Sequence, residues 1–392
     1  MEIVIIAGII FAILFNFVNG LNDAANSIAT VVATRVLTPL QGVLMAAAFN
    51  MIGPLIFTTA IAKTIGQGIV ETGFLTTDVI LIGMIVAVMW VFLSSYLGIP
   101  ISASHALVGG LLGSAIAYGG LAVVILPALS VVYILLLAIL AGAIGGALVL
   151  GGLARYKGEE KLAAYFGLGA LCGVTISIPF AIVIGILPIS GLLAILVFIV
   201  VSPMLGMIAA FLLGMLIIKV FRHSQGKTMN AIFQKLQVFS AAFYSIGHGS
   251  NDAQNAMGVI TAILVAAGIL TEFVVPLWVI IISGASIALG TFLGGWKVVE
   301  TMGTKITKLR TYQGFCAETG GGVVLSFVTA FGVPVSTTHA ISGAIMGVGA
   351  TRGYSAVQWG IVRRIVTAWV ITIPLTAGFA FAFFLFYGAI FL

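Results

Sequence analysis

Charged residues are scarce in this sequence. Asp, Glu, Lys and Arg together make up 7% of its 392 residues, whereas 61% are hydrophobic. Because soluble domains carry roughly 25% charged residues, this scarcity excludes a soluble globular protein and predicts an all-α polytopic membrane protein. Several apolar runs reach the roughly 20 residues that a membrane-spanning helix needs: Ile3–Val18, Val79–Leu97, Leu121–Leu150, Leu192–Ile218 and Val274–Leu293.

Long polar segments and paired cysteines are also missing. No polar stretch is long enough to bury a core of its own, so we expect no soluble domain. The two cysteines, Cys172 and Cys316, lie in apolar or glycine-rich surroundings, which favours buried free thiols over a disulfide. The first apolar run lacks a basic leader and a small-residue cleavage site, so it is interpreted as a retained helix and not as a signal peptide.

The basic residues do not form a single patch. Although the net charge is +6, Lys and Arg gather at the ends of apolar runs, as in cytoplasmic loops, so no nucleic-acid partner is expected. One cluster lies at 155–161 and another within 219–237. Two spanning segments separate the clusters, which places both on one face, expected to be cytoplasmic. Residues 219–237 are interpreted as a solvated polar linker without chemistry.

One short polar motif occurs twice inside apolar sequence. Asn-Asp-x-x-Asn begins at Asn22 and again at Asn251, and a glycine precedes each copy by two residues. An aspartate at the centre of a membrane helix costs about 2.5–3.5 kcal/mol, so Asp23 and Asp252 require a reason. We expect the two copies to build one buried polar site from both halves of a duplicated chain.

A second motif is duplicated as well. Gly-x-Pro-x-Ser-x-Ser/Thr-His spans 98–105 and 332–339. The Asn-Asp copies are 229 residues apart and these copies 234, so the halves differ by a five-residue insertion. Repeats of this kind are common in secondary transporters, often inverted, with the substrate at their interface. The sequence predicts a first repeat at 1–120, intervening helices for scaffold or dimer contacts at 121–218, the cytoplasmic linker at 219–237 and a second repeat at 238–392.

The second motif has the signature of a helix that begins inside the membrane. Proline fixes φ and the following serine can cap the first N–H groups. Such breaks occur only where the backbone is buried in protein or lines a polar cavity, and a helix N-terminus favours an anion. The hydroxyl groups that would add hydrogen-bond donors there belong to Ser102, Ser104, Ser336, Thr337 and Thr338.

The Asn-Asp motif complements these donors with oxygen ligands. Asn22 or Asp23 is expected to cap a helix that begins at the motif, with Asn26 one turn further on. All-oxygen ligation suits Na⁺ and similar hard cations. An oxyanion beside monovalent cations is close to neutral, so the two motifs together predict cation-coupled anion symport. The candidate cation ligands are Asn22, Asp23, Asn26, Asn251, Asp252 and Asn255.

Other interpretations of these residues stay open. Asn and Ser can simply hold membrane helices together, at about 0.6 kcal/mol per contact, although two duplicated motifs argue against this. His105 and His339 are interpreted as structural residues or as proton carriers, and Lys63 and Lys297 as snorkelling residues.

Two further classes of protein are disfavoured. An intramembrane aspartyl protease needs two carboxyls that share a proton and would leave the hydroxyl motifs without a purpose, so no enzyme is expected. An anion channel is disfavoured because buried carboxylates repel a passing anion.

The two Gly-x-Asn-Asp-x-x-Asn motifs, joined to the two Pro-x-Ser-x-Ser/Thr-His segments, resemble those of the PiT family of inorganic phosphate transporters over essentially the whole chain. The resemblance implies a secondary phosphate symporter of the prokaryotic type, without a cofactor. It also implies about twelve transmembrane segments, inverted repeats, a homodimer and a place in the cell's inner (plasma) membrane. By position it implies that phosphate and cation contacts come from Asp23, Asn26, Asp252 and Asn255.

The Gly-Phe-x-Ala-Glu element that ends at Glu318 is family-like as well. Glu318 is interpreted as a third cation or proton site, or as an acid solvated at a helix end. Its counterpart in the first half is Met84, so a mechanism with two glutamates is not expected. Na⁺ is the expected coupling ion and H⁺ the alternative, because the family contains both kinds of member. Sulfate is the nearest competing anion.

Overall fold

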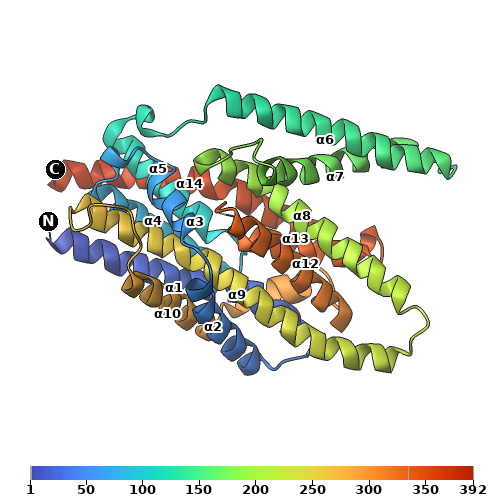
Figure 1. Cartoon of the computed structure of the whole chain (residues 1–392). Coiled ribbons are helices and arrows are strands. Elements are labelled where there is room, and N and C mark those ends of the chain that lie inside the picture. Colours follow the sequence, from blue (N-terminus) through green and yellow to red (C-terminus); the bar gives the residue numbers. More distant parts are fainter. Residues whose placement is uncertain (1, 334, 392) are drawn as a thin grey trace.

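The computed structural model describes residues 2–333 and 335–391, which form an assembly of helices (Figure 1). In this part of the chain, fourteen α-helices are joined by loops and short 3₁₀ or π turns. The predicted all-α membrane architecture is thereby confirmed. The helices are α1 (Glu2–Ala33), α2 (Pro39–Ile56), α3 (Ala60–Gln67), α4 (Thr77–Leu97), α5 (Ala103–Gly119), α6 (Leu129–Tyr156), α7 (Leu162–Val183), α8 (Gly191–Val220), α9 (Gly226–Ala266), α10 (Leu277–Leu293), α11 (Trp296–Glu300), α12 (Thr311–Ala330), α13 (Thr337–Ala350) and α14 (Trp359–Phe391).

Seven of the described helices are long and apolar enough to cross a membrane individually: α1, α2, α4, α6, α7, α8 and α14. α10 and the segment at 296–305 pass the same test together as one span that is bent by 67°, which raises the number to eight. This bend lies outside the two Pro-Ser segments, where the sequence predicted helices that begin inside the membrane. The expected total of about twelve segments stays a prediction.

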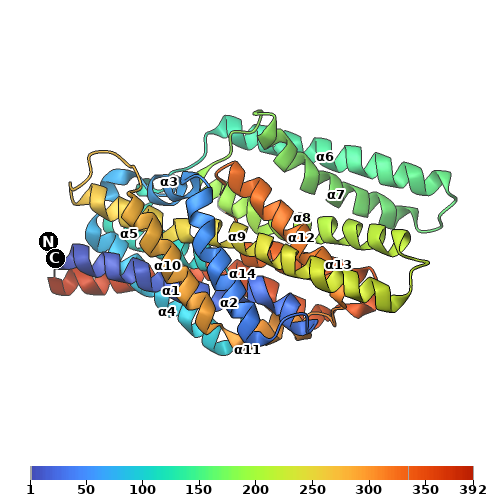
Figure 2. The ribbon, with the colours of Figure 1, turned by 60° about the horizontal axis from the view of Figure 1, so that its bottom comes forward.

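The two halves of the chain run in opposite directions. The end of α1 and the beginning of α9 line one cavity, whereas Gly8 near the start of α1 faces Ile263 near the end of α9. Figures 1 and 2 show these two helices packed together in opposite senses. Because α1 and α9 carry the equivalent Asn-Asp motifs, their arrangement is that of an inverted repeat.

The last helix of each half packs on the other half. α14 lies along α5, and α8 lies along α13. Gly109 and Gly113 of α5 approach the α14 backbone in the same way as Gly343 and Gly347 of α13 approach α8. α8 is therefore the counterpart of α14. Within the intervening region, only α6 and α7 lack a counterpart, and they pack mainly on each other as an outlying hairpin (Figure 1).

The glycine before each Asn-Asp motif allows two helices to touch. A Cβ at Gly20 would lie 2.2 Å from the carbonyl oxygen of Ile287 in α10, and one at Gly249 would lie 2.2 Å from that of Asn50 in α2. A side chain at either position would push the neighbouring helix outward. The two glycines thus fix the depth at which the aspartate three residues later enters the core.

We expect Gly20→Ala and Gly249→Ala to destabilise the protein by about 1–3 kcal/mol each, the usual cost of overpacking. The measurement is the midpoint of thermal unfolding in detergent, which should fall for both variants. Gly152→Ala in α6 is the matched control, because nothing lies within 4 Å of the Cβ that it would add. Equal midpoints for all three variants would contradict the close helix contacts.

The segment at 219–237, interpreted as a solvated loop, is mostly helical. α8 continues to Val220 and α9 begins at Gly226, so only 221–225 lies between them. Gln237 is fully buried and hydrogen-bonded to Glu318, which makes the end of the segment part of the core. The polar composition reflects the exposed first turns of α9, where a helix can carry polar side chains without becoming a loop.

Candidate functional site

The two Asn-Asp motifs lie within long, uninterrupted helices. α1 passes through Asp23 and α9 passes through Asp252 without a break, so the expectation that the motif caps the start of a helix was wrong. Both aspartates are 2% exposed. In a continuous helix the aspartate and the asparagine three residues later share one face, which aims both side chains of each motif at the same place.

Asp23 and Asp252 meet at one imidazole ring. His248, one turn before Asp252 on α9, places its Nε2 atom 3.3 Å from Asp252 Oδ2 and 3.9 Å from Asp23 Oδ2. One ligand atom from each of the three residues lies within 4.8 Å of the other two. The structure therefore brings the acids of the two halves into a single buried cluster.

Sequence reasoning missed His248. Its counterpart in the first half is Asn19, whose Nδ2 atom donates to Asp252 Oδ2 at 3.4 Å. Both residues precede an aspartate by four positions, which places them on the same helix face as that aspartate. This i, i+4 spacing in both copies is the signal that would have extended each motif toward its N-terminus.

The two Pro-Ser segments begin helices inside the protein, as predicted. Ser102 caps α5 by accepting from the backbone N–H of His105 at 3.3 Å, and Ser336 caps α13 by accepting from that of His339 at 3.2 Å. The first turns of both helices are buried. Pro334, the proline of the second copy, lies outside the described residues.

Asparagines of one half bind hydroxyls at the helix tip of the other half. Asn26 donates to Thr338 Oγ1 at 3.0 Å, and Asn255 donates to Ser104 Oγ at 2.9 Å. Ser104 and Thr338 are counterparts, and so are the two asparagines. The same bond is thus made twice across the interface of the repeats, which ties the helix tip of each half to the Asn-Asp motif of the other half.

The first asparagine of each motif binds a hydroxyl within its own half. Asn22 donates to Ser95 Oγ at 2.8 Å. The amide of Asn251, oriented to satisfy both of its ends, accepts from Thr329 Oγ1 at 3.0 Å and donates to Asp252 Oδ1 at 3.3 Å. Of the two asparagines, Asn251 thus also binds the aspartate next to it.

The tip of α13 contacts both aspartates, and the tip of α5 does not. Thr337 Oγ1 lies 3.3 Å from Asp23 Oδ2 and 3.3 Å from Asp252 Oδ2, and Thr338 Oγ1 donates to Asp23 Oδ1 at 3.1 Å. The counterpart of Thr337 in the first half is Ala103, which has no hydroxyl group. The site is therefore asymmetric although the repeats are equivalent.

Glu318 is buried apart from the two aspartates. It lies on α12 and accepts hydrogen bonds from Gln237 Nε2 at 3.1 Å and from the hydroxyls of Ser240 and Thr30. Thr30 follows Asp23 by seven residues on α1, which corresponds to about 10 Å at 1.5 Å per residue. The interpretation of this acid as solvated at a helix end was wrong, because it is 0% exposed.

The remaining candidates lie away from the acids. The rings of His105 and His339 meet edge to face with their centroids 4.9 Å apart, and His339 stacks on Trp369 with a centroid distance of 3.9 Å. Both histidines are buried. Lys63 and Lys297 are exposed, and the latter donates to the Tyr96 carbonyl at 2.9 Å; the snorkelling interpretation stays a prediction.

The donor set at the centre suits a hard cation. Two buried amide oxygens on the face of α1 that carries Asp23 have no hydrogen-bond partner among the described residues: the Oδ1 atoms of Asn19 and Asn26. Unpartnered buried acceptors beside two carboxylates are costly unless a positive charge satisfies them. No Lys or Arg side chain in the described part of the chain pairs with Asp23 or Asp252. A bound Na⁺ would supply the missing charge and use the same oxygens.

Comparisons with known proteins agree with this architecture. The family model described as "Phosphate transporter family" matches residues 19–167 and 163–380, in two copies that follow the two halves. The chain is 41% identical to a protein of Rhizobium meliloti (strain 1021) named "Probable low-affinity inorganic phosphate transporter", over 93% of this chain and 91% of that protein. A Bacillus subtilis (strain 168) protein with the same name is 33% identical over 94% and 92%.

A solved structure described as "The sodium-dependent phosphate transporter" has the same fold. It matches with a TM-score of 0.69 over 100% of both chains, at 24% sequence identity. The family match extends over most of the sequence, and two relatives exceed 30% identity over nine-tenths of it. This chain belongs to the phosphate transporter family.

Proposed function

We propose that the chain is a secondary active symporter that carries inorganic phosphate together with Na⁺. The observation that supports this most strongly is the meeting of Asp23 and Asp252, one from each half, at the hydroxyl-bearing tip of α13. Membership of a transporter family also agrees with the sequence-based expectation that the chain is not an enzyme.

The geometry of His248 favours a positive charge between the acids. Asn50 Nδ2 donates to Thr291 Oγ1 at 2.9 Å, so Asn50 Oδ1 accepts from His248 Nδ1 at 3.1 Å. The other nitrogen of a neutral ring then presents a lone pair to two carboxylates, and these groups repel one another. A Na⁺ ion held by Asp23, Asp252 and amide oxygens removes this repulsion.

Cation binding would prepare the site for the anion. The N-termini of α5 and α13 offer N–H groups and partial positive charge, and Ser102, Ser104, Ser336 and Thr338 add hydroxyl groups. Two bare carboxylates repel an incoming oxyanion, whereas carboxylates that are paired with Na⁺ do not. Coupling then follows from electrostatics, because phosphate enters a site that the cation has already neutralised.

Phosphate suits this site better than sulfate does. A phosphate monoanion or dianion has a hydroxyl group that can donate a hydrogen bond to a carboxylate, and sulfate has none at neutral pH. Asp23 and Asp252 lie beside the tip of α13, so an oxyanion bound there could donate this hydrogen bond to them only if it is phosphate.

H⁺ coupling is the second candidate, and His248 is the observation that favours it. A proton on Nε2, 3.3 Å from Asp252 and 3.9 Å from Asp23, relieves the same repulsion that Na⁺ would relieve. The ring would then carry the coupled proton.

The proposal includes an architecture. When α2 is counted with α3 and α10 with α11, the helices form twelve membrane segments, four of which are α5, α9, α12 and α13. We place them in the plasma (inner) membrane as a homodimer. The oligomeric state is measured by light scattering in detergent, where a mass of one chain per particle would contradict the dimer.

The test of the proposed function is uptake of radiolabelled phosphate by proteoliposomes under two separate driving forces. An imposed Na⁺ gradient should drive phosphate accumulation at constant pH, and a pH gradient without Na⁺ should not. The opposite result would replace Na⁺ by H⁺. Sulfate in excess should compete poorly, and equal competition would assign the wider oxyanion class.

Loss of the paired tip hydroxyls should weaken phosphate binding. Ser104→Ala and Thr338→Ala each remove a hydroxyl that an asparagine of the other half orients. We expect KM for phosphate to rise about five- to tenfold, because a hydrogen bond to a charged group contributes about 1.5–3 kcal/mol, part of which other donors replace. Thr372→Ala in α14, whose hydroxyl binds a carbonyl of its own helix, is the control. An unchanged KM in both test variants would remove these hydroxyls from the anion site.

A further inference from the structure

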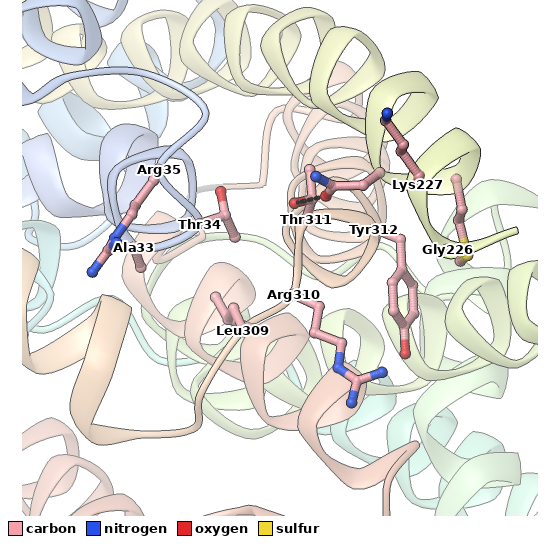
Figure 3. Close-up of a pocket in the computed structure, with 11 residues that line it drawn as sticks. Ala33, Thr34, Arg35, Gly226, Lys227, Leu309, Arg310, Thr311 and Tyr312 are labelled. Atoms are coloured by element: carbon pink, nitrogen blue, oxygen red, sulfur yellow. Dashed lines mark hydrogen bonds between the residues drawn. The ribbon is translucent and has the colours of Figure 1, made fainter.

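A cavity opens at the end of the molecule where α1 ends and where α9 and α12 begin (Figure 3). Its volume is about 540 Å³. Thr311 of α12 and Asn230 of α9 both belong to its lining, and Thr311 Oγ1 donates to Asn230 Oδ1 at 2.7 Å. Its lining consists of Ala33, Thr34, Arg35, Gly226, Lys227, Met229, Asn230, Leu309, Arg310, Thr311 and Tyr312.

The charged groups of the cavity all have the same sign. Arg35, Lys227 and Arg310 line it, and no acidic residue does. Figure 3 shows the three cationic side chains on three different sides, not converging on one point. Walls that carry charge of one sign focus the field and raise the local concentration of counter-ions. The cavity is therefore suited to gather small anions with low affinity.

The backbone of Arg35 is held in a conformation that side chains rarely adopt. Its φ of 59° is the only positive value at a non-glycine position among the described residues. The N–H of Arg35 donates to the Val32 carbonyl and that of Val36 to the Val31 carbonyl, which is the Schellman arrangement that closes a helix and normally has glycine at this position. A strained residue at such a place indicates a use for its side chain.

The second half provides the comparison. α9 ends in the same arrangement, with Gly268 at φ 71°. Other helices of this chain that end in this way also use glycine, at Gly98, Gly158, Gly185 and Gly332. The strain at Arg35 is thus confined to the helix that opens into the cationic cavity.

Hydrogen bonds link the lining of the cavity to the buried acid Glu318. Thr34, which lines the cavity, donates to Gln237 at 3.0 Å, and Gln237 donates to Glu318 at 3.1 Å. Asp23, Asn26, Thr30 and Thr34 follow one another on a single face of α1.

The equivalent face of α9, toward the opposite end of the molecule, becomes apolar. There Val259 and Ile263 follow Asn255, at the spacing at which Thr30 and Thr34 follow Asn26. Of these two described helices, only α1 continues its polar face from the Asn-Asp motif toward the cationic cavity.

We propose that the cavity between Arg35, Lys227 and Arg310 is a second, low-affinity site for inorganic phosphate, which the anion occupies at the cationic face before or after it binds at the central site. This inference rests on the proposed phosphate transport. The cationic groups attract phosphate to the cavity, and their separation keeps it from binding tightly enough to delay release.

The test uses membrane vesicles of both orientations, so that labelled phosphate is offered to one face at a time. For Arg35→Gly and Arg310→Gln, we expect the half-saturating phosphate concentration at the cationic face to rise at least threefold and that at the opposite face to stay unchanged. Lys157→Gln is the matched control, because it removes the same charge outside the lining of the cavity. Unaltered half-saturation in both test variants, or an equal rise with the control, would overturn the inference.

Two further readouts separate the alternatives. If Arg35 serves only to complement the end of α1, Arg35→Gly should lower the thermal unfolding midpoint and leave the transport kinetics alone, which would overturn the inference. We expect an equal or higher midpoint, because glycine relieves the backbone strain. An unaltered chain that transports no phosphate from either face overturns the proposed function and this site with it, whereas normal transport with insensitive variants overturns the second site alone.

Discussion

Asp23→Asn and Asp252→Asn should each abolish cation-driven phosphate uptake. Each aspartate is buried, each lies beside His248, and each contacts Thr337 of α13. Removing one partner of a buried ion pair costs about 3–5 kcal/mol, and 2.8 kcal/mol is roughly a hundredfold in affinity. A site with one carboxylate would hold the coupling cation too weakly to work at ordinary concentrations.

The same substitutions should leave the fold intact. Asparagine has nearly the shape of aspartate, and its amide oxygen can still accept from Thr338 or Thr337. We therefore expect thermal unfolding midpoints close to that of the unaltered protein while uptake falls at least a hundredfold. Glu71→Gln, at an exposed carboxylate outside the site, is the control for the loss of one negative charge. Full uptake by both test variants would rule out a cation at the two aspartates.

Much of the site could be predicted because each of its two motifs occurs once in each half of the sequence. A carboxylate inside apolar sequence is costly, so Asp23 and Asp252 were recognisable without a structure. A serine that follows a proline can cap the start of the next helix, and Ser102 and Ser336 do cap helices. The equality of the two copies also predicted that both halves contribute to one place. Short-range rules were sufficient for each of these inferences.

What the sequence did not reveal depends on contacts between distant segments. The continuity of α1 and α9 could not be told from the motif, because an asparagine or aspartate fits a helix interior as well as a cap when distant partners satisfy it. Asn26 finds Thr338 more than 300 residues away. The packing of α8 on α13 and the burial of Gln237 also depend on contacts between segments that are far apart in the sequence.

The asymmetry of the site is partly visible in the sequence. Met84 occupies the position in the first half that corresponds to Glu318. The residues around the acid follow the same pattern, because Gln237 and Ser240 correspond to Gly8 and Phe11 in the first half. The polar cluster around Glu318 is absent as a whole from the first repeat. It therefore indicates a role that only the second repeat performs.

Glu318→Gln should weaken the dependence of transport on the coupling cation without removing phosphate binding. The carboxylate is fully buried and is held by donors only, from Thr30, Ser240 and Gln237. No cationic side chain among the described residues pairs with it. When this carboxyl ionises, its negative charge is therefore balanced only by neutral hydrogen-bond donors. A Na⁺ ion bound beside Glu318 would stabilise the ionised carboxylate, about two helical turns from Asp23 along α1.

Glutamine keeps the shape of the side chain and one acceptor oxygen but removes this charge. We expect the half-saturating Na⁺ concentration to rise about tenfold, equivalent to about 1.4 kcal/mol, with KM for phosphate at saturating Na⁺ changed little. Glu318→Met reproduces the residue of the first half and should give at least the same shift. If Glu318 instead holds the hydrogen-bonded cluster together, both variants will lower the unfolding midpoint and leave the Na⁺ dependence unaltered. The ratio of these two effects decides whether the unpaired acid of the second repeat serves ion coupling or the packing of α1, α9 and α12.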